Sequence, residues 1–214
     1  MTANAPLIQS LRYLVLLLLA AGIAGCATSA SKVERYTAPP NGATWKYVQK
    51  NSGSYGKDTE YTLTRAEGDW QGRRAMLLKS SRGTTTVASL EDGKLAAVLG
   101  PDGKEISKWE PPILWDYPLA VGQQWSKPIK MTIQAGGRVL TFDWKCTVAG
   151  HGDVTVAAGT IKAFHVDCQN TIGTHEAFWY SPAIGNFVKM SVRRDGSSPF
   201  GVGTQETELS AYSK

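Results

Sequence analysis

The chain has 214 residues, with 23 lysines and arginines against 18 aspartates and glutamates, which gives a formal charge of +5. The excess is not gathered in a basic run, because its densest clusters are the pairs Arg73-Arg74 and Arg193-Arg194. A nucleic-acid-binding protein would need a basic stripe, so we predict no nucleic-acid partner. A solvated surface of mixed charge explains the excess most simply, and attraction to anionic lipid headgroups or cell-wall polymers is the alternative.

The first 25 residues have the composition of an export signal. They carry one charged side chain, Arg12, which precedes an apolar run that ends in small residues. This is the layout of a secretory signal peptide. The run is too short to span about 30 Å of hydrocarbon. A buried core helix would need a polar face, and residues 14–23 have none.

A cysteine follows the small residues directly. The sequence Ile23-Ala24-Gly25-Cys26 resembles the lipobox of bacterial lipoproteins. The resemblance implies that the chain is cut before Cys26 and that this residue receives acyl chains such as palmitate. Two or more acyl chains anchor a protein stably, so the lipid bilayer is the expected partner. Ala27 follows the cysteine, which by resemblance to Gram-negative sorting favours the periplasmic face of the outer membrane over the inner membrane.

The rest of the chain divides into a tether and a folded part. Removal of residues 1–25 would leave 189 residues, enough for one large domain or two small ones. Residues 26–41 are small and polar and end in Pro39-Pro40, so we predict a lipidated tether that spans roughly 20 Å. We expect a single β domain over residues 42–214.

Short segments with alternating polarity fill the expected domain. Turn pairs such as Asp92-Gly93 and Gly136-Gly137 interrupt them, and these pairs accept positive φ. No stretch after Cys26 keeps an apolar stripe for three helical turns. The pattern predicts an all-β fold, with an antiparallel sheet that forms a barrel, a half-barrel or a sandwich. The candidate strands are Thr44–Lys50, Glu60–Arg65, Arg74–Ser80, Thr84–Leu90, Lys94–Leu99, Ile129–Gln134, Arg138–Val148, Val154–Ala157, Thr160–Cys168, His175–Tyr180, Asn186–Arg193 and Gln205–Tyr212.

A weak internal repeat suggests a duplicated sheet. Gly42-Ala-Thr-Trp45 matches Gly122-Gln-Gln-Trp125, and each is followed by a strand with an aromatic residue. The two pseudo-repeats would cover about residues 42–112 and 117–214. The segment Trp109–Tyr117, with its two prolines, would join them. Chance similarity among short strands is the alternative.

Two cysteines remain after Cys26, namely Cys146 and Cys168. Apolar and polar residues alternate around each, which places both sulfurs on the apolar faces of their strands. Neighbouring antiparallel strands bring opposed β-carbons to about 4.5–5.5 Å, close to bridging range. In an oxidising compartment this pair predicts a disulfide, and two buried thiols are the alternative.

Three segments of the second half carry a family resemblance. They are Tyr117-Pro-Leu-Ala-Val-Gly-Gln-Gln-Trp125, Val154-Thr-Val-Ala-Ala-Gly-Thr-Ile-Lys-Ala-Phe-His-Val166 and Phe178-Trp-Tyr-Ser-Pro-Ala-Ile-Gly-Asn-Phe-Val-Lys189. Together they resemble the TapB-like exported β proteins of unknown function, over about residues 117–190. The chain departs at Ala157, where that family usually has proline, and at Ile161, where phenylalanine is usual. The resemblance implies turns at Ala158-Gly159 and Pro182–Gly185 but brings no catalytic residue.

The sequence offers little for catalysis. The three histidines, His151, His165 and His175, lack the spacing of a metal site, so we predict neither metal nor cofactor. His151 is expected in a turn. His165 and His175 lie on neighbouring candidate strands and would be solvent-facing, or would face each other across the sheet. An envelope or cell-wall hydrolase that uses one of them with Asp167 is the alternative to a non-enzymatic protein.

Seven tryptophans are more than core packing requires. Trp45, Trp125, Trp144 and Trp179 lie on or beside candidate strands and are expected in the core. Trp70, Trp109 and Trp115 fall in turn or linker sequence, where they would cover the ends of the sheet or line a groove for a ligand.

These observations predict a membrane-anchored lipoprotein with a non-enzymatic β domain for binding or assembly. Its partner would be an apolar ligand or another envelope protein.

Overall fold

The computed structural model describes residues 31–214. The predicted signal peptide and Cys26 lie outside the described residues. Those described form an all-β fold, as the sequence predicts. Its elements are β1 (Lys32–Val33), β2 (Thr44–Gly53), β3 (Thr59–Trp70), β4 (Arg73–Ser80), β5 (Thr85–Ala88), β6 (Leu95–Leu99), β7 (Glu105–Ile113), β8 (Leu119–Ala120), β9 (Gln124–Ile133), the short 3-10 turn η1 (Ala135–Gly137), β10 (Arg138–Val156), β11 (Gly159–Asn170), β12 (Thr174–Ser181), β13 (Asn186–Arg194) and β14 (Gly203–Ser213).

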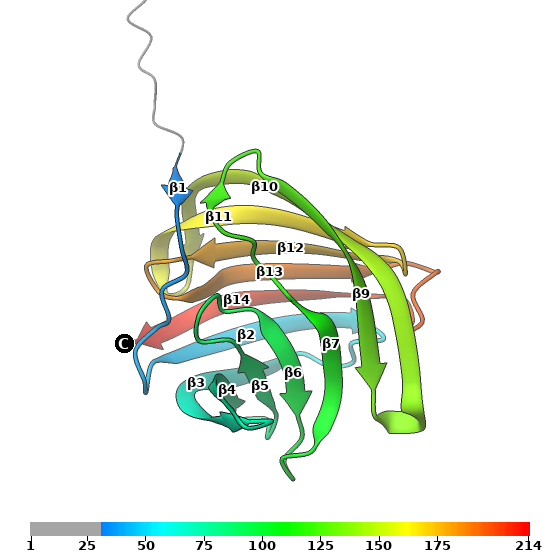
Figure 1. The fold of residues 1–214 in the computed structure, drawn as a ribbon. Helices are drawn as coiled ribbons and strands as arrows, with labels where there is room; N and C mark the ends of the chain where they lie inside the picture. The colour runs from blue at the N-terminus through cyan, green and yellow to red at the C-terminus, as the bar shows by residue number, and fades with distance from the viewer. Residues whose placement is uncertain (1–30) are drawn as a thin grey trace, which may run out of the picture. The chain divides into compact units, whose positions relative to one another are not determined.

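Twelve of these strands form one closed antiparallel barrel (Figure 1). Neighbours follow the order β10-β11-β12-β13-β14-β2-β3-β4-β5-β6-β7-β9. The ring closes because β9 pairs with β7 on one side and with β10 on the other. Of the three predicted arrangements, the structure is therefore the barrel. Closure gives each of the twelve strands a paired neighbour on both sides.

Alternation of side chains separates an apolar interior from a polar exterior. Along β2, Trp45, Tyr47 and Gln49 are buried, whereas Lys46 and Lys50 are exposed. Outside, charged residues on neighbouring strands form ion pairs, for example Lys189 with Glu208 across β13 and β14 at 2.8 Å. Period-two alternation of this kind is what a barrel with a lined interior requires.

The long β10–β11 hairpin contributes to two apolar clusters. The part nearer β9 places Phe142, Trp144 and Val166 in the larger cluster. The far end places Val156 and Ile161 in a second cluster with β13 and β14, and the Ala158 N–H donates to the Leu209 carbonyl at 3.3 Å. Figure 1 shows how strongly these two strands curve.

Two segments differ from the sequence-based expectation. Trp109, Pro111 and Pro112 belong to strand β7 rather than to a linker. Both prolines lie beyond Glu110, the last β7 residue paired with β9, so their missing N–H groups break no hydrogen bond with that strand. His151 lies within β10 rather than in a turn, because a register shift after Val148 lets the strand continue.

The stretch predicted as a tether is partly built into the domain. β1 pairs with β8 through Lys32 and Val33. Pro39 is buried and approaches Gly185 so closely that an added Cβ at the glycine would lie 2.9 Å from the proline ring. Residues 31–214 form one compact unit.

Turn positions named by the family resemblance have the expected backbone. Gly185, between β12 and β13, has φ of +69°, and Gly159, which follows the β10–β11 turn, has φ of +115°. Positive φ at these positions favours glycine. The proposed duplication of the sheet stays a prediction.

Within residues 31–214, no helix is long and apolar enough to cross a membrane.

Candidate functional site

The barrel encloses two adjoining cavities, which together we call the lumen. Their volumes are about 280 Å³ and about 550 Å³. They share much of their lining, which includes Leu63, Leu95, Trp109, Ile113, Phe187 and Met190. Cavities of this size and apolar character are typical of small-molecule binding sites.

Aromatic residues close the end of the lumen formed by the smaller cavity, which we call the narrow end. Trp115 is buried, with its ring centroid 5.3 Å from that of Phe178 and 5.2 Å from that of Tyr180. Tyr117 donates a hydrogen bond from its hydroxyl to that of Tyr180 at 3.2 Å, and burial raises the pKa of Tyr117 to about 12. Tyr36, from the segment after β1, packs against Gly93 at the same end. We call residues 36–39 and Trp115 the cap.

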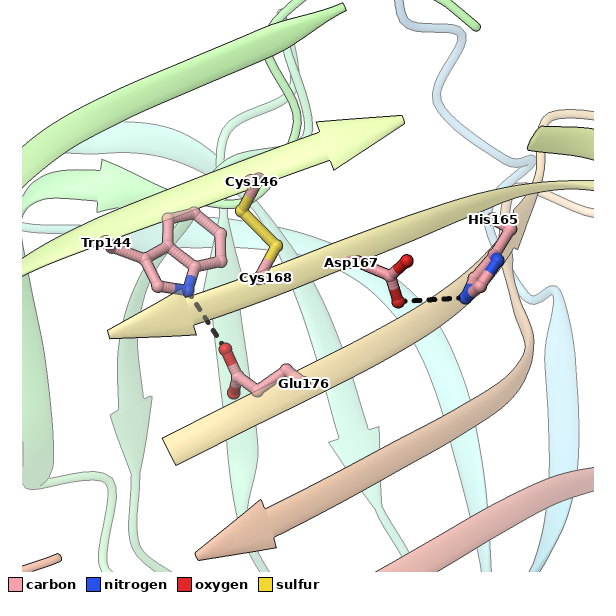
Figure 2. Close-up of a disulfide and its surroundings, with 6 residues drawn as sticks. All are labelled: Trp144, Cys146, His165, Asp167, Cys168 and Glu176. Carbon is pink, nitrogen blue, oxygen red and sulfur yellow. Dashed lines mark hydrogen bonds and ion pairs between the residues drawn. A yellow bond between two sulfur atoms is a disulfide. The ribbon is translucent and has the colours of Figure 1, made fainter. Parts of the chain in front are cut away.

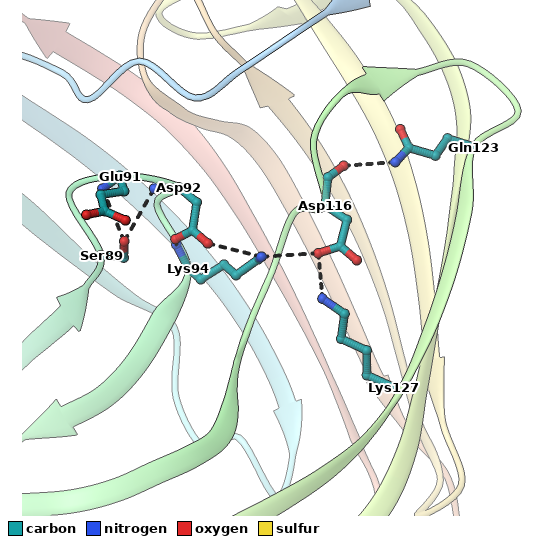
Figure 3. A network of polar contacts seen from close by, with 7 residues as sticks. All are labelled: Ser89, Glu91, Asp92, Lys94, Asp116, Gln123 and Lys127. Carbon is teal, nitrogen blue, oxygen red and sulfur yellow. Dashed lines mark hydrogen bonds and ion pairs between the residues drawn. The ribbon is translucent and has the colours of Figure 1, made fainter.

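A polar network holds the segment that carries Trp115 (Figure 3). Asp116 accepts from Lys127 at 2.5 Å and pairs with Lys94 at 3.3 Å. Gln123 donates to the Asp116 backbone carbonyl at 3.0 Å. Lys94 comes from the β5–β6 turn and Lys127 from β9, so the network ties the segment between β7 and β9 to strands on both sides of it.

A carboxyl group lies within the apolar lumen. Glu176 on β12 lines both cavities, and Trp144 on β10 donates its indole N–H to the carboxyl oxygen Oε2 at 3.0 Å (Figure 2). Burial raises the pKa of Glu176, and the hydrogen bond from Trp144 and the charge of Arg194 oppose that rise without cancelling it. The raised pKa favours the uncharged acid, which can donate as well as accept a hydrogen bond.

The wide end of the lumen is cationic. Arg194 at the end of β13 contacts two aromatic rings, with its guanidinium carbon 4.1 Å from the centroid of Tyr55 and 4.9 Å from that of Phe200. Arg82, in the β4–β5 turn, lies 5.4 Å from the ring centroid of Tyr61. Both arginines line the larger cavity, and Arg82 is exposed, so this end reaches solvent.

The structure brings together two of the three tryptophans predicted to line a groove. Trp109 lines both cavities and Trp115 lines the narrow one. Trp70 lies instead in a separate groove beside Arg73 and Arg74. Trp144, expected only as a core residue, also lines the lumen.

The histidines do not meet. In the register of β11 and β12, His165 lies opposite Trp179, and His175 lies opposite Gln169. The expectation that the two histidines face each other is therefore wrong, because they are offset by four residues along the strands. His165 stacks on Trp179 with centroids 4.5 Å apart, and its Nε2 lies 3.0 Å from an oxygen of Asp167 (Figure 2). In the described part of the chain, no group of three or more histidines, cysteines or carboxylates could hold a metal ion.

The predicted disulfide is present. Cys146 on β10 and Cys168 on β11 are directly opposite each other, with Cα atoms 4.1 Å apart (Figure 2). Both cysteines belong to the larger apolar cluster. The bridge therefore joins two strands close to Trp144 and Glu176.

Three polar residues of the lumen were not among the predicted site residues. Glu176 shares its strand face with Phe178 and Tyr180, so a carboxyl on the apolar face of β12 was a readable signal. Arg194 likewise shares a face with Val192. Arg82 lies in a turn, where alternation gives no information.

No protein-family model and no curated protein matches this chain. Solved structures show a distant likeness. A protein described as exported, with a YmcC-like fold, from Bacteroides fragilis is 11% identical, with TM-score 0.46, and 85% of this chain and 100% of that chain are covered. The hypothetical lipoprotein YmcC from Escherichia coli is 13% identical, with TM-score 0.45 and coverage of 97% and 98%. A protein described as a lipoprotein from Parabacteroides distasonis is 10% identical, with TM-score 0.42 and coverage of 85% and 99%.

Proposed function

We propose that this protein is a bacterial lipoprotein whose barrel binds an apolar or amphipathic ligand in its lumen and catalyses no reaction. Cys26 would carry the acyl anchor and hold the domain at the periplasmic face of the outer membrane. The observation that carries the proposal is the pair of adjoining cavities inside a closed barrel. Their lining supplies apolar and aromatic surface for a chain and few polar groups to orient it.

Ligand capture tests the binding role. Residues 31–214 form one compact unit whose barrel closes on itself, so we expect this unit to fold alone. The unit would be incubated with bacterial membrane lipid extract, repurified and extracted for mass spectrometry. We expect a stoichiometric amphipathic molecule, and a ligand-free protein would contradict the proposal.

A matched pair of variants shows whether the ligand lies inside. Thr86 lines both cavities, whereas Thr85, its neighbour on β5, lines neither. Thr86→Trp adds an indole to the lumen, and Thr85→Trp adds the same ring on the opposite face of the strand. We expect Thr86→Trp alone to lose the captured ligand. Equal loss in both variants would place binding elsewhere.

The anchor has its own test. Replacement of Cys26 by serine removes the thiol to which lipid would attach. We expect that variant to leave the membrane fraction in an expressing Gram-negative host, while the wild type stays in it. Continued membrane fractionation of the variant would contradict the lipid anchor and leave the binding role of the barrel untouched.

A further inference from the structure

We propose that the ligand of the lumen is an amphiphile with an anionic oxygen head group, which binds Arg82 and Arg194 while its chain extends toward Trp115. The inference rests on the proposed binding function of the lumen and narrows it to one class of ligand. A carboxylate and a phosphate monoester share the required chemistry, because arginine recognises the oxygens of both.

Arg194 is held in place, but one of its donors lacks a partner. Its guanidinium lies over the rings of both Tyr55 and Phe200. Contact with the two rings restrains the position of the guanidinium group. The buried Nε atom has no hydrogen-bond partner among the described residues. A buried donor without a partner is costly, and an anionic ligand oxygen would satisfy it.

Arg82 is oriented by a second chain of contacts. Its Nη1 donates to the side-chain oxygen of Gln49 at 3.1 Å, and Gln49 in turn donates to the Thr207 hydroxyl at 3.2 Å. Gln49 and Thr207 are both buried. These two hydrogen bonds hold Arg82 at the rim of the larger cavity and engage only its Nη1.

Neither arginine is neutralised by an ion pair within residues 31–214. Buried Arg65, by contrast, pairs with Glu67 at 2.7 Å. Glu176 is the lumen carboxyl whose charge acts on Arg194. It is hydrogen-bonded to Trp144, and burial raises its pKa, which weakens its ability to neutralise the arginine. The wide end of the lumen is therefore complementary to an anion rather than a cation.

The lining of the lumen determines the orientation in which an amphiphile would bind. Beyond the arginines, the lining changes to Leu63, Trp109 and Met190, and it ends at the cap with Trp115. Polar groups at one end and apolar groups at the other match a molecule with one charged head and one chain. The raised pKa of Glu176 favours its uncharged carboxyl group, so the lumen has no second strong charge part-way along its length.

Head-group discrimination tests the inference. Dissociation constants would be measured on the 31–214 unit for dodecanoate, dodecyl phosphate and dodecanol, by displacement of a fluorescent apolar probe below micellar concentrations. The variants are Arg194→Gln and Arg82→Gln, with Arg193→Gln as the control, because Arg193 is exposed and lies next to Arg194 on the other face of β13. Far-UV circular dichroism would check folding.

We expect at least one anionic amphiphile to bind the wild type about tenfold or more tightly than dodecanol, as charge-assisted hydrogen bonds imply. Arg194→Gln should abolish that preference, Arg82→Gln should reduce it and Arg193→Gln should keep it. If Arg194→Gln fails to fold, added salt should weaken wild-type binding of the anion but not of dodecanol. The preferred anion tells whether the head is a carboxylate or a phosphate.

Two failures are distinguishable. Equal affinity of the wild type for dodecanol and both anions would overturn the inference and leave the binding function standing. Loss of preference in Arg193→Gln equal to that in Arg194→Gln would also overturn it. Absence of binding by all three compounds would contradict both the inference and the proposed function.

Discussion

At the scale of single residues, the lumen combines an apolar lining with a few placed polar groups. Glu176 is the least expected of them, since a carboxyl group in an apolar interior is destabilising in its charged form. The indole N–H of Trp144 stabilises that form in part, at 3.0 Å, and burial still raises the pKa of Glu176. The protein thus tolerates a destabilising group, as proteins often do where a ligand binds.

Replacement of Glu176 by glutamine tests this cost through its pH dependence. Because the folded pKa is raised above its ordinary value of 4.5, the folded state binds the proton more tightly than the unfolded state. The stability from this group is complete below that value and is lost as pH rises through the folded pKa. Glutamine keeps an acceptor for Trp144 but cannot ionise. We expect the difference in unfolding free energy, variant minus wild type, to grow in urea titrations as the pH rises above the ordinary pKa of 4.5.

Comparison with the variant is needed because other carboxylates act in the opposite direction. Hydrogen bonds lower the pKa of Asp58 and of Asp195, so the stability that these two groups contribute to the fold is lost as pH falls. Glu208→Gln, on the outer face of β14, is the matched control. A pH-independent difference for Glu176→Gln would show that this carboxyl has no raised pKa.

At the scale of elements, the cap depends on a close approach between segments far apart in sequence. Gly93 has φ of +69°, and a Cβ added there would lie 2.6 Å from the ring of Tyr36. Gly42 has a similar φ of +87°, but an added Cβ would meet nothing within 4 Å. Alanine would strain the backbone at both positions but would displace the cap only at Gly93, so comparing the two variants separates these effects.

Alanine at Gly93 should push Tyr36 out of its site. Since Arg35 directly precedes Tyr36, we expect trypsin to cut after Arg35 faster in Gly93→Ala than in the wild type. Gly42→Ala should suffer the strain of a non-glycine residue at positive φ, about 1 kcal/mol, without faster cleavage at Arg35. Equal rates in the two variants would mean that Gly93 does not seat the cap.

The disulfide is the second feature at this scale. Cys146 and Cys168 are 22 residues apart, so the bridge restricts the unfolded chain by an amount that corresponds to about 3 kcal/mol. We expect replacement of both by alanine to lower the unfolding free energy by about that much or more, because the alanines also leave a gap in the apolar cluster. A loss under about 1 kcal/mol in urea titrations would argue against this account.

At the scale of the whole molecule, local patterns predicted the fold class but not the lumen. Alternation around Cys146 and Cys168 located two strands and their bridge, since period two is a local property. Closure of the barrel depends on the pairing of β9 with β7. Strand β7 was not predicted, because Pro111 and Pro112 are typical of a break between strands. Trp109 and Trp115 were found as outliers in turn-like sequence. Arg82 and Arg194 were not, because their convergence depends on the barrel.

The most direct measurement is the crystal structure of the 31–214 unit with dodecanoate that carries bromine on its terminal carbon. Anomalous scattering locates the bromine without reference to the protein density. We expect one peak inside the lumen, at the narrow end beside Trp115, with the carboxylate near Arg194. A peak only on the outer surface of the barrel, or an unoccupied lumen at saturating ligand, would contradict it.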